Sequence, residues 1–175
     1  DEVAAETGRR LLVVPGAELR VRHLGEETHL VALFPPGSVA ERFNALLANL
    51  GLRAPVAALD DLPYFAIDRD PLEVARLVVE AGGICHAGHV DRTFGDYCFI
   101  ESELVHHLAE CPYISAIELI DSSCRGRFRD GLAVAHISSS DSHSLAEIGR
   151  RTATLEMPEL SFEGLKAAFA AARGR

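Results

Sequence analysis

The alternation of apolar runs with segments of helical spacing constrains the fold of this chain more than any other feature. Short runs rich in Val, Ile and Leu indicate buried strands, and the segments between them carry helix start and stop signals. The candidate strands are Leu11–Val14, His29–Phe34, Gly83–Gly88, Ile114–Ile120, Leu132–Ile137 and Thr152–Met157. This alternation predicts an α/β fold with parallel strands and crossover helices, in which binding groups collect at the carboxyl ends of the strands.

Helix boundaries are marked by capping residues. A capping box at residues 38–41 opens a helix that Gly51 is placed to close. Asp70 is an N-cap before proline at the first helical position, and the pair Gly82-Gly83 stops that helix. Further helices are expected at about Glu101–Glu110, Ser144–Arg150 and Ser161–Ala172.

Size and composition fit one globular domain. A chain of 175 residues with 48% hydrophobic and 25% charged residues supplies a substantial core. Its net charge of −9 argues against an extended, non-specific grip on nucleic acid, which usually requires a basic face. No apolar run approaches the roughly 18 residues of a membrane span, and no signal segment is recognisable, so we expect a cytoplasmic protein with no membrane partner.

The cysteines form no Cys-x-x-Cys pair of the kind that zinc ribbons use. We expect them to be reduced and mostly buried. A disulfide framework is the alternative, which a chain of this size and apolar content does not need.

Residues of metal-binding type occur at or near the ends of the candidate strands. Asp141 and His143 are two residues apart after an apolar run, and in an extended segment this spacing sends both side chains to one face. Glu18 follows the first candidate strand, His29 lies on the second and His89 ends the third. Taken alone, each of these residues has an ordinary explanation as a polar residue in a surface loop, in a turn or partly buried in the fold. Together they predict a metal site.

Two further residues, His86 and Arg92, lie close to His89 in the sequence. Period-2 alternation sends His86 and His89 to opposite faces of a strand, so we expect His89 to enter the site and His86 to point away. Arg92 follows closely and is a candidate phosphate clamp, because a guanidinium can hold phosphate oxygens in bidentate fashion. An ion pair at the rim of the site is the alternative for Arg92.

The order of these motifs resembles the PHP (polymerase and histidinol phosphatase) superfamily of metal-dependent phosphoesterases over nearly the whole chain. The similar segments are the Pro-Gly-x-Glu motif ending at Glu18, the His-bearing strand 28–33, the Gly-Gly-strand-His segment 82–89, the strand 116–120 and, most specifically, Ser139–Gly149. Gly88-His89-Val90 stands where the family usually has Ala-His-Pro.

The resemblance implies a distorted (β/α)7 TIM-like barrel. No histidine precedes Glu18, so the family's His-x-His motif is absent. We expect that the first βα unit is missing from this chain, and a divergent member of the family is the alternative. Residues 1–175 would then be a single PHP-like metal-dependent phosphoesterase domain that is incomplete at its N-terminus. An unpaired strand edge would favour association, so a homo-oligomer is a further expectation.

The resemblance also implies a metal-dependent phosphoric ester hydrolase. Its ligands would be Glu18, His29, His89, Asp141 and His143, with Glu18 bridging two or three divalent ions. Zn, Mn or Fe suit such mixed carboxylate and imidazole ligands. The expected substrate is a phosphorylated small molecule or nucleotide, with Arg92 holding its phosphate and an activated water attacking phosphorus.

Three alternatives stay open. The closing segment, residues 149–169, is similar to PHP domains fused ahead of ATPase modules, and with such a module the substrate would be nucleic acid and the activity that of a nuclease. The chain would otherwise be a non-catalytic PHP module of a larger protein. A metal-dependent amidohydrolase uses similar ligands on a related barrel, although no lysine carbamate site is recognisable here. The acidic net charge favours small substrates.

Overall fold

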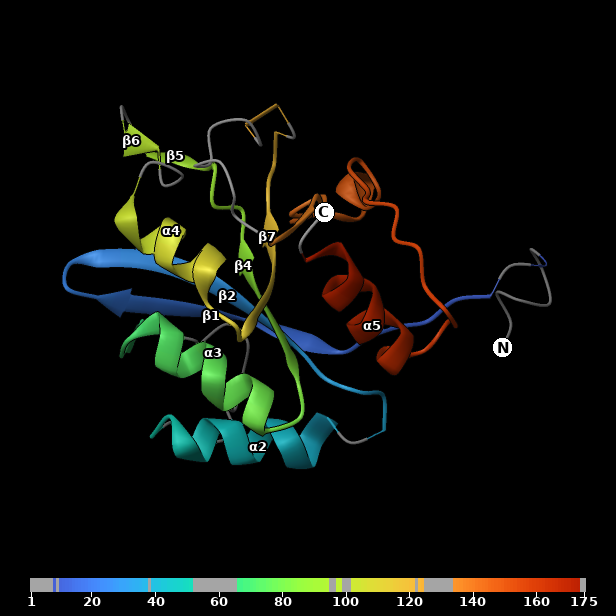
Figure 1. Cartoon of the computed structure of the whole chain (residues 1–175), viewed down its shortest axis with the longest axis horizontal. Helices are drawn as coiled ribbons and strands as arrows, with labels where there is room; N and C mark the ends of the chain where they lie inside the picture. Colours follow the sequence, from blue (N-terminus) through green and yellow to red (C-terminus); the bar gives the residue numbers. More distant parts are fainter. Residues whose placement is uncertain are drawn as a thin grey trace.

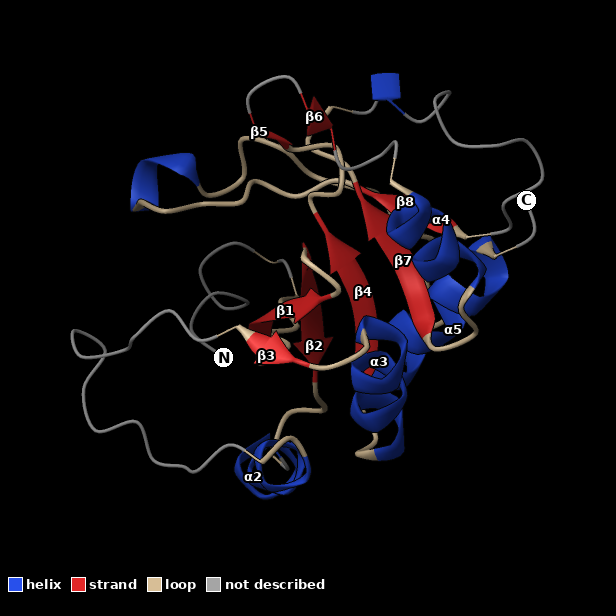
Figure 2. Ribbon diagram, turned by 90° about the vertical axis from the view of Figure 1, so that its left-hand side faces the viewer, coloured by secondary structure: helices blue, strands red, loops and turns tan. Residues whose placement is uncertain are grey.

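The computed structural model describes residues 8, 10–37, 39–51, 66–94, 97–98, 102–121, 123–124 and 134–173. Within these ranges the chain forms an α/β structure around a mixed sheet of six strands in the order β3-β1-β2-β4-β7-β8 (Figures 1 and 2). These strands are β1 Gly16–His23, β2 Glu26–Leu33, β3 Ile67–Asp68, β4 Ile84–Gly88, β7 Ile114–Glu118 and β8 Ala135–Ile137. A separate two-stranded ribbon joins β5 Thr93–Phe94 to β6 Tyr97–Cys98.

The helices are α2 Val39–Asn49, α3 Pro71–Glu80, α4 Glu103–Glu110 and α5 Phe162–Ala172. Their start signals act largely as the sequence predicts. The Asp70 carboxylate accepts the Leu72 N–H at 2.8 Å, and Ser161 accepts the Gly164 N–H at 2.9 Å. The segment 144–150, predicted as a helix, forms only a 3-10 turn at Leu145–Glu147. Ser38 of the first capping box lies outside the described residues.

An antiparallel hairpin at the start of the sheet departs from the predicted parallel arrangement. β1 pairs with β2 from Gly16 opposite Leu33 to His23 opposite Glu26. The turn between them has positive φ at both Leu24 (50°) and Gly25 (86°), which is the geometry of a tight two-residue hairpin turn. The strand predicted at residues 11–14 is therefore wrong, since the strand begins at Gly16 and contains Glu18.

The rest of the sheet combines both strand directions. β2 is antiparallel to β4, whereas β4, β7 and β8 run parallel to one another. The described strands form an open sheet with β3 and β8 at its edges (Figure 2), so the closed TIM-like barrel is not confirmed and stays a prediction. Residues 152–157, predicted as a strand, are described without one.

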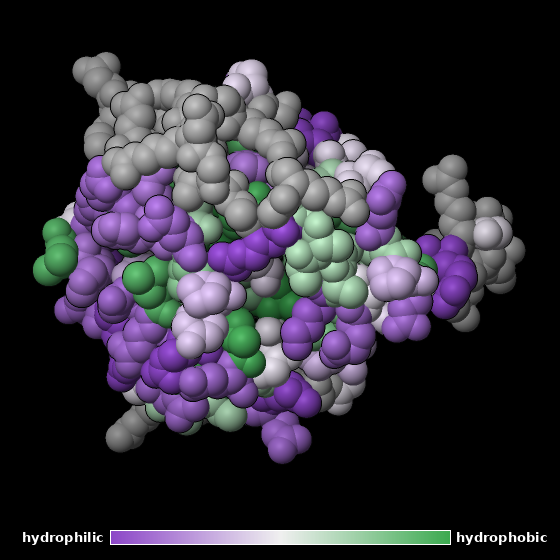
Figure 3. All heavy atoms as spheres, viewed as in Figure 1, coloured by the Kyte–Doolittle hydropathy of each residue, from purple (hydrophilic) through white to green (hydrophobic). Residues whose placement is uncertain are grey.

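The two faces of the sheet carry different cores. One face packs against α2, α3 and α4 through residues such as Leu30, Val78 and Leu108. The opposite face packs against α5, which lies apart from the other helices in Figure 1, through Phe162 and Phe169. Polar side chains predominate over α2 and α3 in the lower part of Figure 3, so the outer faces of these helices are turned to solvent.

On the α5 face, apolar residues give way to polar ones along the same strands. β4 presents Ile84 to the α5 core and then His86, two residues further on, while β7 presents Ala116 and then Glu118. Because alternate residues share a face, His86 and Glu118 follow the core residues on that face towards the carboxyl ends of the strands. The sheet thus positions polar groups beyond the end of the α5 core.

Cys85 and Cys111 are buried and free, and Cys124 is half-buried and free, as the sequence predicts. Burial raises the pKa of the Cys85 thiol, which keeps it protonated. The side chain of Cys98 lies outside the described residues. No helix in the described ranges is long and apolar enough to cross a membrane.

Arg173, at the end of α5, is expected to be a stability determinant. Its guanidinium donates to the carbonyl oxygens of Cys111 at 2.7 Å and Ile114 at 2.9 Å, which joins α5 to the segment between α4 and β7. Hydrogen bonds to charged groups contribute about 1.5–3 kcal/mol, and solvent weakens those of a half-buried side chain such as Arg173. Loss of both bonds in Arg173→Ala should therefore lower the free energy of unfolding by about 2 kcal/mol in total. Urea denaturation measures this change. Arg150→Ala on the exposed turn is the control, and equal midpoints for both variants would contradict the assignment.

Candidate metal centre

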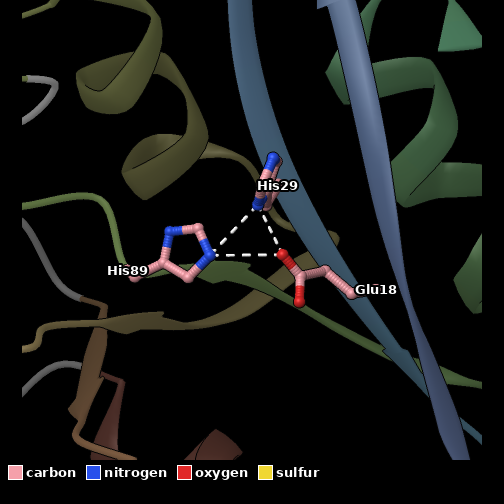
Figure 4. Close-up of side chains that lie close together, drawn as sticks. All are labelled: Glu18, His29 and His89. Carbon is pink, nitrogen blue, oxygen red and sulfur yellow. Dashed lines mark hydrogen bonds and ion pairs between the residues drawn. The ribbon is translucent and has the colours of Figure 1, made fainter. Parts of the chain in front are cut away.

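Three side chains from different strands point toward one another on the α5 face of the sheet (Figure 4). Glu18 comes from β1, His29 from β2 and His89 from the residue directly after β4. His89 Nε2 is 3.0 Å from His29 Nδ1 and 3.2 Å from Glu18 Oε1, and His29 Nδ1 contacts the same oxygen. All three donor atoms lie within 4.8 Å of one another. We call Glu18, His29 and His89 the ligand triad.

Strand register brings the triad together. In the hairpin, Glu18 pairs with Val31 and Arg20 pairs with His29, so Glu18 and His29 are diagonal neighbours on one face. His29 pairs in turn with Gly88 of β4, which places His89 one residue beyond that pair. The antiparallel hairpin, which the sequence analysis did not predict, is therefore what aligns the first two donors.

The backbone at His89 brings its ring to the same face. Its φ is +31°, in the left-handed region that non-glycine residues rarely adopt. This turn breaks the period-2 alternation, and His86 and His89 consequently line the same hollow. The expectation that His86 points away from the site was wrong for this reason.

The triad geometry suits a tetrahedral divalent ion. Donor bonds of ~2.1 Å at tetrahedral angles place neighbouring donor atoms ~3.4 Å apart. The two distances from His89 Nε2, 3.0 and 3.2 Å, are shorter than this, and His29 Nδ1 and Glu18 Oε1 are closer still, so the three side chains would move apart to admit an ion. Two imidazole nitrogens and one carboxylate oxygen are donors that Zn, Mn and Fe accept, and three protein ligands leave one position for water or substrate.

The charges of the triad favour a cation. Hydrogen bonds from His29 and His89 hold the pKa of the Glu18 carboxyl well below its usual range, so Glu18 is an anion. Burial lowers the pKa of His89, but the hydrogen bond and charge of Glu18, together with Asp141, outweigh burial and raise that pKa above its ordinary value. A metal ion bound to Glu18 and His89 would replace the proton that these two side chains share.

A second carboxylate lies behind His29. Glu27 Oε1 is 3.9 Å from His29 Nε2 and is itself held by Arg20 at 2.6 Å. Glu27 Oε2 accepts from Arg22 at 3.0 Å. The two arginines hold Glu27 beside the ring nitrogen of His29 that does not face the triad, at a distance longer than that of a hydrogen bond.

The triad borders an open hollow of about 440 Å³. Its lining residues are Glu18, Val31, His86, His89, Glu118, Ile137 and Ser139–Ser142, including Asp141. Three carboxylates in one concave surface attract cations. A smaller pocket of about 30 Å³ adjoins the other side of the triad and is lined by His29, His89 and Arg92, among others.

The remaining candidates predicted from the sequence lie at or outside the rim. Asp141 lines the hollow with its side chain 18% exposed, and its Oδ2 is 3.5 Å from Arg92 Nη2. His143 is exposed, and its Nδ1 donates to the carbonyl oxygen of Asp141 at 2.9 Å. Neither Asp141 nor His143 belongs to the ligand triad. Their role as further ligands stays a prediction.

Two buried residues of the site were not predicted. Glu118, 5% exposed, accepts the His89 N–H at 2.9 Å and the Ser139 hydroxyl. His86 is 7% exposed, its Nδ1 has no hydrogen-bond partner in the described part of the chain, and burial lowers its pKa to about 4. A charged residue within the apolar strand 116–120 was the available signal for Glu118, because buried carboxylates need specific partners.

No protein-family model, curated protein or solved structure matches this chain.

Proposed function

We propose that the ligand triad binds a divalent transition-metal ion and that the chain is a metal-dependent phosphoesterase. The observation that carries this proposal is the convergence of one carboxylate oxygen and two imidazole nitrogens at the border of an acidic hollow. These three residues are among the five that the resemblance to the PHP superfamily names as ligands, the other two being Asp141 and His143. A barrel completed by an N-terminal βα unit, a second or third ion, further ligation by Asp141 and His143, and a cytoplasmic location belong to this proposal.

A bound divalent ion supplies Lewis-acid polarisation of phosphoryl oxygens and lowers the pKa of water. The residues of this chain supply the rest. Arg92 lines the small pocket beside His29 and His89, and its side chain is 37% exposed, so it is the arginine we assign to a phosphate group bound at the triad. Asp141 neutralises Arg92 when no substrate is present, and a phosphate would compete for the same guanidinium.

The charge of the hollow favours a small phosphate ester over nucleic acid. Glu18, Glu118 and Asp141 line it, and its lining residues in the described part of the chain include no Lys or Arg. A polyanionic strand would meet repulsion there, whereas a single phosphate can be neutralised by the ion and Arg92. A non-catalytic metal-binding module is the second candidate, favoured by the exposed position of His143, which leaves three donors in the described cluster.

Hydrolysis assays of the Mn- or Zn-loaded protein test the proposal. We expect a chromogenic phosphomonoester to be hydrolysed, a phosphodiester to be hydrolysed more slowly, and a chelator to abolish both activities. Binding of metal without hydrolysis of either ester would favour the non-catalytic module. Preference for the diester would favour the nuclease.

Arg92→Ala is expected to raise KM for the phosphomonoester by roughly 10–100-fold, because a charge-assisted hydrogen bond to phosphate contributes about 1.5–3 kcal/mol. Arg92→Lys should recover part of this loss, since lysine keeps the charge without the bidentate fork. Steady-state kinetics measure the effect. Arg76→Ala, which removes an exposed guanidinium paired with Glu80 on α3, is the matched control. An unchanged KM for Arg92→Ala would remove Arg92 from the site.

A further inference from the structure

Glu118 is a buried carboxylate at the carboxyl end of β7, and it lines the hollow without belonging to the ligand triad. Its exposed fraction is 5%. A carboxylate is costly to bury unless hydrogen bonds replace its hydration. The partners of Glu118 therefore indicate its role.

These partners come from two separate segments of the site. Glu118 Oε2 accepts the backbone N–H of His89 at 2.9 Å, and Oε1 accepts the hydroxyl of Ser139. Ser139 begins the part of the loop that carries Asp141 along the hollow. One side chain thus joins the residue after β4 to the loop after β8.

The contact to His89 occurs where the backbone conformation is unfavourable. A φ of +31° at a non-glycine residue persists only when its surroundings fix it. The hydrogen bond from the His89 N–H to Glu118 fixes this conformation, which turns the ring toward Glu18 and His29.

We propose that Glu118 is a positioning residue, which sets the ring of His89 for metal binding and ties the Asp141 loop to it. The inference rests on the proposed metal site. Glu118 acts through its hydrogen bonds and not as a ligand, because its two oxygens are directed to the His89 N–H and the Ser139 hydroxyl. Partners of this kind, behind the ligands of a metal site, typically change affinity by 10–100-fold when they are lost.

Two substitutions separate hydrogen bonding from charge. Glu118→Gln keeps the reach of the side chain, so its carbonyl oxygen still accepts from His89 and its amide donates to the Ser139 oxygen. Glu118→Asp keeps the charge but is one methylene shorter. Titration with Zn²⁺ should give an affinity within about threefold of wild type for Gln and a loss of about 10–100-fold for Asp. The reverse order, or no effect of either substitution, would overturn the proposal.

Hydrogen exchange of the metal-free protein provides a second readout. Glu118→Asp should accelerate exchange of the His89 amide at least about tenfold, while Glu118→Gln should not, because only the shorter side chain releases that N–H. If wild type binds no Zn²⁺, the proposed function fails, and this exchange comparison still decides the positioning role. Unchanged exchange in Glu118→Asp would overturn it.

Controls for folding are available in the same chain. Ser102→Ala removes the N-cap of α4, where Ser102 accepts the Val105 N–H at 3.2 Å, and should lower stability without changing Zn²⁺ affinity. If Glu118→Asp does not fold, the Zn²⁺ affinity of Glu118→Gln is the measurement that tests the proposal. A loss of more than about tenfold in Glu118→Gln would then show that charge or direct ligation matters and would overturn positioning by hydrogen bonds.

Discussion

Glu18→Gln is expected to weaken Zn²⁺ binding by more than about 100-fold, beyond the range typical for residues behind the ligands. Glu18 is the anionic donor of the triad, and its Oε1 contacts both imidazoles. The amide removes the charge that neutralises a divalent ion and replaces one strong donor oxygen by a weaker one. Competition with a chromophoric chelator measures the affinity over this range.

The control for Glu18→Gln lies in the same hairpin. Glu26 is exposed at the end of β2 next to the turn, so Glu26→Gln makes the same chemical change away from the triad. Its Zn²⁺ affinity should equal that of wild type. If Glu18→Gln also binds within about threefold of wild type, the triad is not the metal site.

The second large effect is on pH dependence. The affinity for Zn²⁺ should fall at least about tenfold for each pH unit below the pKa of His89, because His29 and His89 both bind an ion only as neutral imidazoles. A metal ion binds neutral imidazole, and the pKa of His89 is raised above its ordinary value of about 6.5, so His89 still carries a proton to release at pH values where a free imidazole has lost it. Glu18 adds no slope, because its lowered pKa keeps it ionised throughout. Affinity measured from about pH 5.5 to 8.5 should rise and then level off.

The metal-free protein should show the opposite trend. A raised pKa at His89 contributes stability that is present below the unfolded-state pKa and is lost as pH rises through the folded-state pKa. The lowered pKa of Glu18 contributes stability above its unfolded-state value of about 4.5, lost only in stronger acid. A Zn²⁺ affinity independent of pH, together with flat metal-free stability between about pH 6 and 8, would contradict the proton exchange proposed here.

The sequence predicted the α/β class and most helices because their signals are local. Asp70-Pro71 and Ser161 act through contacts within a few residues, and both open helices in the structure. The hairpin escaped prediction since its turn is Leu24-Gly25, and the first of these rarely adopts positive φ. Strand direction was consequently assigned as parallel where β1 and β2 are antiparallel.

The sequence predicted which residues form the candidate site better than it predicted where they lie on the strands. Glu18, His29 and His89 were selected for their chemistry and their places near strands, and they converge. Glu18 was nevertheless expected beyond a strand and lies within one. Alternation also misassigned His86, because the left-handed backbone at His89 is fixed by the tertiary contact with Glu118, which no sequence period encodes.

A crystal of the protein grown with Zn²⁺ and measured at the zinc absorption edge tests the central claim most directly. The account predicts an anomalous peak about 2.1 Å from Glu18 Oε1, His29 Nδ1 and His89 Nε2. The same crystal of His89→Ala should lack that peak, while crystals of His107→Ala, which alters an exposed histidine of α4, should keep it. Zinc bound only at exposed histidines such as His107 or His143, with the triad still joined by its own hydrogen bonds, would contradict the account.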